Sequence, residues 1–138
     1  MAYWLFKTEP ETWSWENQKK RGDKGETWNG VRNFQAAKNM KTMKCGDFGF
    51  FYHSGEERRI VGIVEVIREY HPDPTDQTGR FGMVAVKAVK EFANPVTLAE
   101  IKSDPKLQDM VLVRNSRLSV QPVKPNEWQI ICRAGGMV

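Results

Sequence analysis

The sequence predicts an α+β fold in which one curved, barrel-like, mixed β-sheet carries several short helices at its periphery. Three observations favour it: strand-like stretches recur along the chain, the helix signals between them are short, and no repeat, linker or low-complexity segment interrupts the 138 residues. Long strands joined by short helices must hide their edges, and a curved sheet does so. This length fits one domain, which we place at residues 1–138.

Three elements are expected in the first third of the chain. Residues 3–8 (YWLFKT) alternate like a half-buried strand, which Pro10 ends. Ser14 is placed to cap a short helix that runs to Lys20, and Asn33 is placed to cap a second helix that begins FQAAK. The second helix should bury residues that recur every three positions: Phe34, Ala37, Met40 and Met43.

Strands predominate from Asp47 onward. DFGFFYHS and RIVGIVEVIREY form a predicted hairpin across the turn SGEERR, and RFGMVAVKAVKEF adds a third long strand after a loop at residues 71–79. The remaining segments are, in order, a helix that Pro95 and the capping box Thr97–Glu100 start and Pro105 closes, an extended or irregular stretch at residues 111–123, and a last helix from Pro125.

Composition argues against several classes of protein. Hydrophobic residues make up 40% and charged residues 28%, which is typical of a soluble globular protein, and no apolar run approaches the ~20 residues of a membrane span. The N-terminus lacks the features of a signal peptide, so we expect a cytoplasmic protein. Cys45 and Cys132 are expected to be buried, and with His53 and His71 they make no metal-ligand spacing. We therefore expect no metal and no cofactor.

The charge of the chain suits a polyanionic partner. Lys and Arg outnumber Asp and Glu by 21 to 17, which gives a net charge of +4. Lys38, Lys41 and Lys44 recur at helical spacing. They form either a solvated helix face or a ridge that faces phosphate groups.

The sequence carries no recognisable catalytic constellation. The motifs GxSxG, GxxxxGK[ST] and GxGxxG do not occur in it. His53 and Ser54 are neighbours on a predicted strand, so their side chains point to opposite faces. We therefore expect a binding module with no catalytic residues.

Polar residues with aromatic neighbours point to a site for a planar ligand. They gather in KTEP, WNGVRN, YHS and RNSRLS, at the ends of predicted elements. Trp28 could stack on such a ligand, Asn29 could bond its edge, and Arg32 could meet a phosphate at the start of a helix. Local pattern alone leaves open whether Trp28 packs or binds, whereas Trp13 and Trp15 read as packing residues.

Five ordered motifs resemble the EVE domain: YWLFKTEPETWSWE, WNGVRNFQAAKNMK, DFGFFYHS, VGIVEVIREYHPDPT and LVRNSRLSVQPV. The likeness spans residues 3 to about 132 of a family that includes the thymocyte nuclear protein relatives. It implies a PUA-like pseudo-barrel, related in architecture to YTH and ASCH domains. Relatives of this kind bind nucleic acid, and several take a modified base into an aromatic-walled pocket.

The resemblance also implies which residues build the pocket. They are Lys7, Thr8, Trp28, Asn29, Gly30, Val31, Tyr52, His53 and Ser54, with Arg32, Asn33 and Phe34 at its side and Arg114, Ser116, Arg117 and Leu118 from the irregular stretch.

The expected function is that of a reader of DNA or RNA that holds a flipped or unpaired, modified nucleobase. A methyl group on that base would lie near Val31 or Leu118. The alternatives are a small enzyme acting on a modified nucleotide, with His53 or Lys7 as acid or base, and a module that binds a small molecule or a protein.

Overall fold

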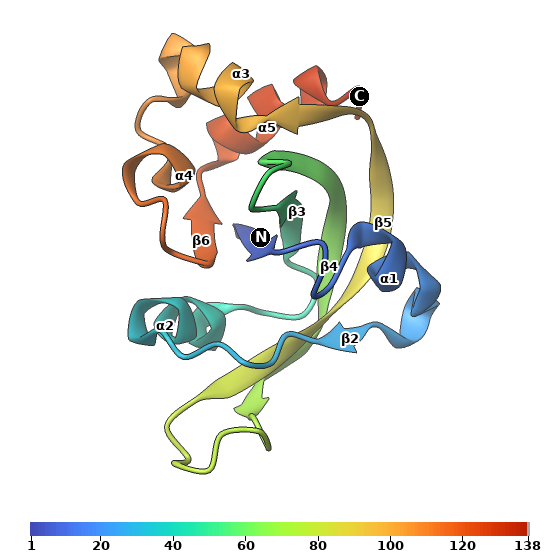
Figure 1. The fold of residues 1–138 in the computed structure, drawn as a ribbon, viewed down its shortest axis with the longest axis vertical. Helices are drawn as coiled ribbons and strands as arrows, with labels where there is room; N and C mark the ends of the chain where they lie inside the picture. The colour runs from blue at the N-terminus through green and yellow to red at the C-terminus, as the bar shows by residue number, and fades with distance from the viewer. Residues whose placement is uncertain (138) are drawn as a thin grey trace.

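The computed structural model describes residues 1–137, and across them a mixed six-stranded sheet curves without closing (Figure 1). Its strands are β1 (Tyr3–Thr8), β2 (Glu26–Thr27), β3 (Phe48–His53), β4 (Arg59–Pro72), β5 (Gly82–Thr97) and β6 (Val120–Val123). They lie in the order β2-β5-β4-β3-β1-β6, with β1 parallel to β3 and the other pairs antiparallel. This arrangement confirms the predicted α+β curved sheet.

Short helices surround the sheet, and the capping residues expected from the sequence start three of them. The helices are α1 (Trp15–Lys20), α2 (Phe34–Thr42), α3 (Leu98–Ser103), α4 (Val111–Arg114) and α5 (Pro125–Ala134), with 3₁₀ turns at Gly22–Lys24 and Pro105–Leu107. The side chains of Ser14, Asn33 and Thr97 each accept a hydrogen bond from the first turn of the helix that follows. No helix within residues 1–137 has the length and apolar character needed to cross a membrane.

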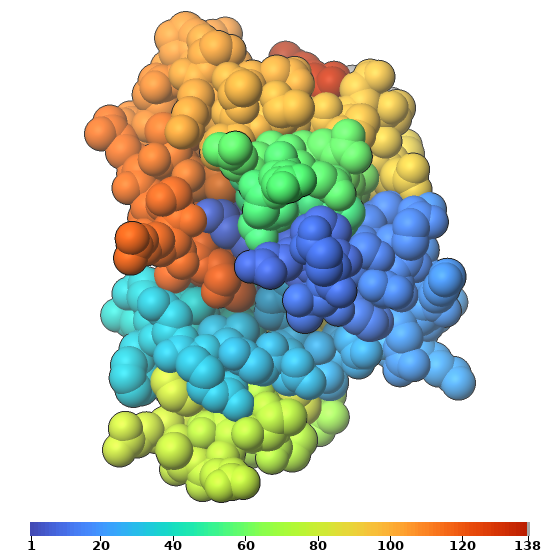
Figure 2. All heavy atoms as spheres, viewed as in Figure 1, coloured from blue at the N-terminus to red at the C-terminus, as the bar shows by residue number. Residues whose placement is uncertain are grey.

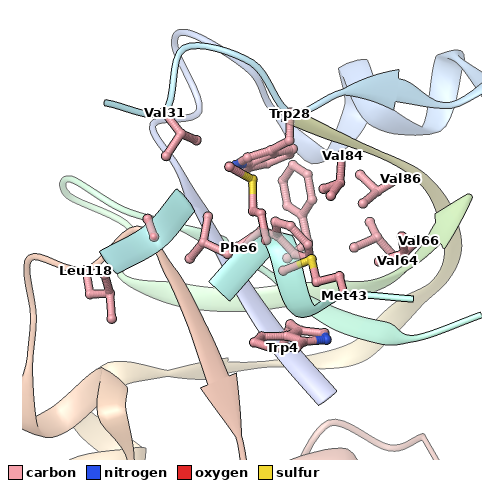
Figure 3. Packing of buried hydrophobic residues seen from close by; sticks show 14 of the residues in the cluster. Trp4, Phe6, Trp28, Val31, Met43, Val64, Val66, Val84, Val86 and Leu118 are labelled. Carbon is pink, nitrogen blue, oxygen red and sulfur yellow. The ribbon is translucent and has the colours of Figure 1, made fainter. Parts of the chain in front are cut away.

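Both faces of the sheet are buried. One face carries a first core, part of which Figure 3 shows: Trp4, Phe6, Trp15, Trp28, Val31, Ala36, Met40, Met43, Phe51, Val61, Val64, Val66, Val84, Val86, Leu118 and Val120. The opposite face carries a second core: Leu5, Phe50, Tyr52, Ile60, Phe92, Val96, Ile101, Leu107, Met110, Leu112, Val123, Trp128 and Ile131. Strand β1 contributes to both, so it is buried on two faces and not half-buried as its alternation had indicated.

The ends of several elements differ from the prediction. Strand β4 continues through Pro72, so the loop before β5 begins at Asp73. Pro95 lies inside β5 and does not start helix α3. Residues 111–123 were expected to be extended or irregular: the strand β6 agrees with this, whereas the short helix α4 does not. Elements of four residues are too short for a periodic signal, and Pro122 masks the strand.

The burial of Phe34 and of the two thiols was also predicted wrongly. Helix α2 buries Ala36, Ala37 and Met40, and Met43 is buried directly after it, whereas its first residue, Phe34, is 66% exposed. Cys45 is exposed and Cys132 is half-buried, although both were expected inside. The lysines at positions 38, 41 and 44 are exposed, and the Lys41 ammonium lies 5.6 Å from the centre of the Tyr70 ring.

The tip of the β4–β5 hairpin, residues 73–81, lies directly below the segment that leads into α2 (Figures 1 and 2). Hydrogen bonds from that segment to Asp73 hold the two together. The hairpin tip is therefore part of the same side of the molecule as residues 28–33.

Candidate functional site

A cavity of about 370 Å³ opens where the end of β1, the residues before α1 and the segment from β2 to α2 meet. The residues that line it are Lys7, Thr8, Thr12, Trp13, Glu26, Thr27, Trp28, Asn29, Gly30, Val31, Arg32 and Ser119. Its volume falls within the range of pockets that hold small organic ligands. Seven of these residues belong to the predicted pocket.

Trp28 lines the cavity and belongs to the first core at the same time. Its side chain is only 8% exposed, and its backbone N–H donates to the Val84 carbonyl at 2.7 Å. The rings of Phe6 and Phe51 meet it edge to face, at centroid distances of 5.2 and 5.7 Å. Figure 3 shows the indole at one end of the core with Val31 beside it. Trp28 thus both packs in the first core and lines the cavity.

Trp13 is a second indole wall, and sequence reasoning had assigned it to packing. Its indole N–H donates to Gln18 Oε1 at 2.9 Å, and the Thr8 hydroxyl donates to the Trp13 carbonyl at 2.9 Å. Gln18 is fully buried and donates in turn to the Val86 carbonyl. These bonds fix both the backbone and the ring of Trp13. Nothing in the local sequence indicates that Gln18 on α1 is buried, so the role of Trp13 as a cavity wall could not be predicted from it.

Asp73 organises the segment that carries Asn29, Gly30 and Arg32. Its Oδ2 accepts from the Gly30 backbone N–H at 2.8 Å and from Arg32 Nη1 at 3.2 Å, and its Oδ1 accepts from the hydroxyl and backbone N–H of Thr75. Burial by itself raises the pKa of this carboxyl, but the hydrogen bonds outweigh burial and lower the pKa to about 2. Gly30 has φ +77°, a conformation that favours glycine, so the segment turns at this point.

Hydrogen bonds therefore fix the position of Arg32 at the rim of the cavity. Besides the Asp73 carboxylate, its guanidinium donates to the Val31 carbonyl at 3.1 Å and to the Thr75 hydroxyl at 3.0 Å. The side chain remains 40% exposed. Asp73 offsets part of its charge, and the same bonds fix where the exposed part points.

Two further lining residues differ in how much they are committed to the fold. Lys7 donates through its ammonium to the Ser116 carbonyl and lies over the Tyr52 ring, and burial lowers its pKa. Asn29 is exposed, and its side-chain amide makes no hydrogen bond to any of residues 1–137. Asn29 is therefore free to bond the edge of a ligand.

His53 does not line the cavity, and both of its ring nitrogens are engaged. The Trp15 backbone N–H donates to Nε2 at 3.0 Å, so the ring proton is on Nδ1, which lies 2.8 Å from Glu57 Oε1. The hydrogen bond with His53 lowers the pKa of the Glu57 carboxyl. His53 thus holds the start of α1. Ser54 supports the end of β1 by donating its backbone N–H to the Thr8 carbonyl.

The other predicted residues also lie away from the cavity lining. Asn33 caps α2, Tyr52 and Leu118 are buried in the second and first cores, Arg114 pairs with Asp109, Ser116 accepts from Lys7, and Phe34 and Arg117 are exposed. Tyr52 points away because successive residues of β3 alternate between the two faces. From the 111–123 stretch, Ser119 alone lines the cavity. Four further lining residues were not predicted: Thr12, Trp13, Glu26 and Thr27.

The part of the chain that the structure describes holds no group of three or more His, Cys, Asp or Glu side chains arranged to bind a metal ion. The chemistry that the cavity itself offers is that of two indole walls, the Val31 side chain, one free carboxamide, several hydroxyl groups, the Glu26 carboxylate and two cations. Such a set can enclose a flat, partly polar ligand with an anionic substituent.

Known proteins resemble this chain in sequence along nearly its whole length. A sequence model of the EVE domain matches residues 2–134. Human thymocyte nuclear protein 1 is 31% identical over an alignment of 162 positions, gaps included, that covers 94% of this chain and 72% of the human protein.

Solved structures resemble it as well. A protein of Rhodopseudomonas palustris is 52% identical with a TM-score of 0.95, covering all of this chain and 95% of that one. Human THYN1 protein, solved in complex with 5-methylcytosine containing DNA, is 30% identical with a TM-score of 0.92 over 98% of each chain. The YTH domain of Mmi1, at 13% identity and a TM-score of 0.57 over 96% of this chain and 86% of that one, shares the fold alone. The expected relation to YTH architecture is thereby confirmed.

Proposed function

This chain belongs to the EVE domain family, and on that premise we propose that it is a non-enzymatic reader that holds one flipped or unpaired, modified nucleobase in the 370 Å³ cavity. The observation that carries the proposal is the likeness, over 98% of both chains, to human THYN1 protein in complex with 5-methylcytosine containing DNA. A methylated cytosine in DNA is therefore the first ligand to test.

The lining residues supply what recognition of a base needs. Trp13 and Trp28 provide aromatic walls, and stacking contributes roughly 1–3 kcal/mol per base. The free amide of Asn29 bonds the polar edge of the base, while Thr8 acts indirectly because its hydroxyl is bonded to Trp13. A 5-methyl group packs against Val31, where burial of one carbon contributes about 0.8 kcal/mol.

Burial of a methyl group alone gives weak discrimination. A difference of about 0.8 kcal/mol corresponds to roughly a fourfold ratio of affinities. Larger discrimination requires that the unmodified base leave part of the cavity unfilled or a polar group unpaired.

The cations at the rim face the sugar–phosphate. Lys7 and Arg32 both line the cavity, and the chain carries a net charge of +4. Binding that rests on contacts with phosphate weakens as salt rises because counterions are released.

The engagement of His53 supports a role without catalysis. A histidine whose Nε2 accepts a backbone N–H and whose Nδ1 is bonded to Glu57 has no free nitrogen for general acid–base work.

The proposal can be tested by titrating the protein with nucleic acids that differ in one base. These are a duplex with one 5-methylcytosine, the same duplex with cytosine, and both strands as single-stranded DNA and RNA. We expect tighter binding of the methylated strand, a steep loss of affinity between about 50 and 200 mM salt, and a smaller preference in Trp13→Ala. Arg114→Gln, which alters an exposed cation paired with Asp109, is the matched control. Equal affinity for methylated and unmethylated strands of every kind contradicts the proposal, and release of an altered base favours an enzyme.

A further inference from the structure

A pair of aromatic rings, Phe34 exposed and Phe81 half-buried, lies directly outside the cavity. Phe34 is 66% exposed, and its ring lies 4.9 Å from the ring of Phe81, at an angle of 31°. The guanidinium carbon of Arg32 lies 5.7 Å from the centre of the Phe81 ring. Arg32 also lines the cavity, so the two rings continue its rim. We call Phe34 and Phe81 the aromatic shelf.

The shelf is rigid because hydrogen bonds fix both segments that carry it. Asp76 accepts from the Phe81 backbone N–H at 2.7 Å and from the hydroxyl and backbone N–H of Thr78. Asp73 joins the same hairpin tip to Gly30 and Arg32. Phe34 is the first residue of α2, which the Asn33 side chain caps. The backbone that carries the two rings is thus held in place before any ligand arrives, which lowers the entropy cost of binding.

The exposure of Phe34 has no explanation in the packing of this chain. Large apolar side chains left in water are informative when they gather beside other aromatic groups. Three cations lie beside the shelf, with Arg32 against Phe81 and with Arg80 and Lys38 exposed nearby in sequence, while the carboxylates of Asp73 and Asp76 are engaged in hydrogen bonds within the hairpin tip and to Arg32. An aromatic surface among cations suits a ligand that is flat and apolar on its faces and anionic at its edge.

We propose that the aromatic shelf stacks on the nucleobase that flanks the base held in the cavity, on the same strand. This inference rests on the proposed function and adds a second base-contacting surface to it. Extrusion of one base leaves its neighbour with an unstacked face, and an aromatic side chain replaces the lost stacking partner. Arg32 lies between the cavity and the shelf, where the phosphate that joins the two nucleotides would pass.

Affinity measurements with Phe34→Ala test the shelf, with Val89→Ala as the control. Val89 is also a large exposed apolar residue, at 47%, and it belongs to neither the shelf nor the cavity. For a duplex with one 5-methylcytosine, we expect Phe34→Ala to weaken binding about 10-fold and Val89→Ala to leave it unchanged. The ratio of affinities for methylated and unmethylated DNA should stay the same in Phe34→Ala, because the cavity is intact.

Photocrosslinking identifies the contact directly. The duplex carries 5-iodouracil at the position next to the 5-methylcytosine, on its 5′ or its 3′ side, and mass spectrometry locates the crosslink. Crosslinks on Phe34 or Phe81 together with the 10-fold loss support the shelf. Full affinity of Phe34→Ala with crosslinks elsewhere overturns the shelf and leaves the proposed function standing. A wild-type protein that binds none of the DNA overturns both.

Discussion

Trp28 and Trp128 are equally exposed, at 8% each, yet they sit in opposite cores and are packed in different ways. Trp128 is stacked with Phe50 and with Tyr3, at centroid distances of 4.0 and 4.5 Å and nearly parallel planes. Trp28 meets Phe6 and Phe51 edge to face, and no aromatic ring within residues 1–137 stacks on it.

The comparison shows that the two faces of one sheet end differently. The second core is closed by α5, whose Trp128 uses its ring faces for packing. The first core ends at a cavity, where Trp28 and the hydrogen-bonded Trp13 form walls. Burial fraction alone does not distinguish the two tryptophans, whereas ring geometry and the adjoining cavity do.

Removal of the stacked indole should have the largest effect. Trp128→Ala should lower the free energy of unfolding by about 3–5 kcal/mol, because it leaves a void between Phe50 and Tyr3. Urea denaturation followed by circular dichroism measures this loss. The folded fraction should still prefer methylated DNA, and a loss below about 1 kcal/mol would show that the closed core does not depend on Trp128.

Asp73 holds the segment that carries Gly30 and Arg32 beside the cavity, and its contribution to stability should depend on pH. Because the pKa of Asp73 is about 2 in the folded protein and ordinarily 3.8, its contribution to stability is present above about pH 4 and disappears as the pH falls toward 2. Asp73→Asn should therefore destabilise the protein by about 1–3 kcal/mol at pH 7.

Urea denaturation of Asp73→Asn and wild type at several pH values checks this sign. Carboxylates common to both proteins cancel in the difference. The gap in stability should narrow from pH 5 to pH 2, and a gap that is constant with pH would show that the Asp73 charge is not what holds the segment.

Asn29 should affect binding without affecting stability. Its amide has no partner among residues 1–137, so Asn29→Ala should change the free energy of unfolding by less than about 0.5 kcal/mol. Loss of one hydrogen bond of roughly 1 kcal/mol to the base should weaken binding about fivefold. Isothermal titration calorimetry provides the comparison, and unchanged affinity would remove Asn29 from the site.

The smallest expected change in stability comes from replacing an exposed thiol, and the two thiols should differ in reactivity. Cys45→Ser, at an exposed position, should change stability by less than about 0.5 kcal/mol. Burial raises the pKa of the Cys132 thiol to about 11, so at pH 8 a disulfide reagent should label Cys45 much faster than Cys132. Equal labelling rates would indicate that α5 does not shield its thiol.

The sequence predicted the architecture well because its signals are local. The caps at Ser14, Asn33 and Thr97 depend on neighbouring residues, and strand alternation depends on positions two apart. The short elements α4 and β6 have too few residues to produce such a pattern.

The site was predicted less completely because its residues depend on contacts distant in sequence. Trp13 becomes a cavity wall through Gln18 and the Val86 carbonyl, and His53 is occupied by the start of α1. Phe34 appeared to belong to a buried helix face, whereas it lies against Phe81, 47 positions later. No local pattern carries this information.

One measurement tests the central claim directly: the NMR signal of a ¹³C-labelled methyl group on a single 5-methylcytosine in a DNA duplex, recorded with and without the protein. We expect binding to shift this methyl signal through ring currents of the two indoles and to produce nuclear Overhauser effects to Trp28 and Val31. Binding that leaves the methyl signal at its position in free duplex, with contacts only to neighbouring bases, would contradict the account.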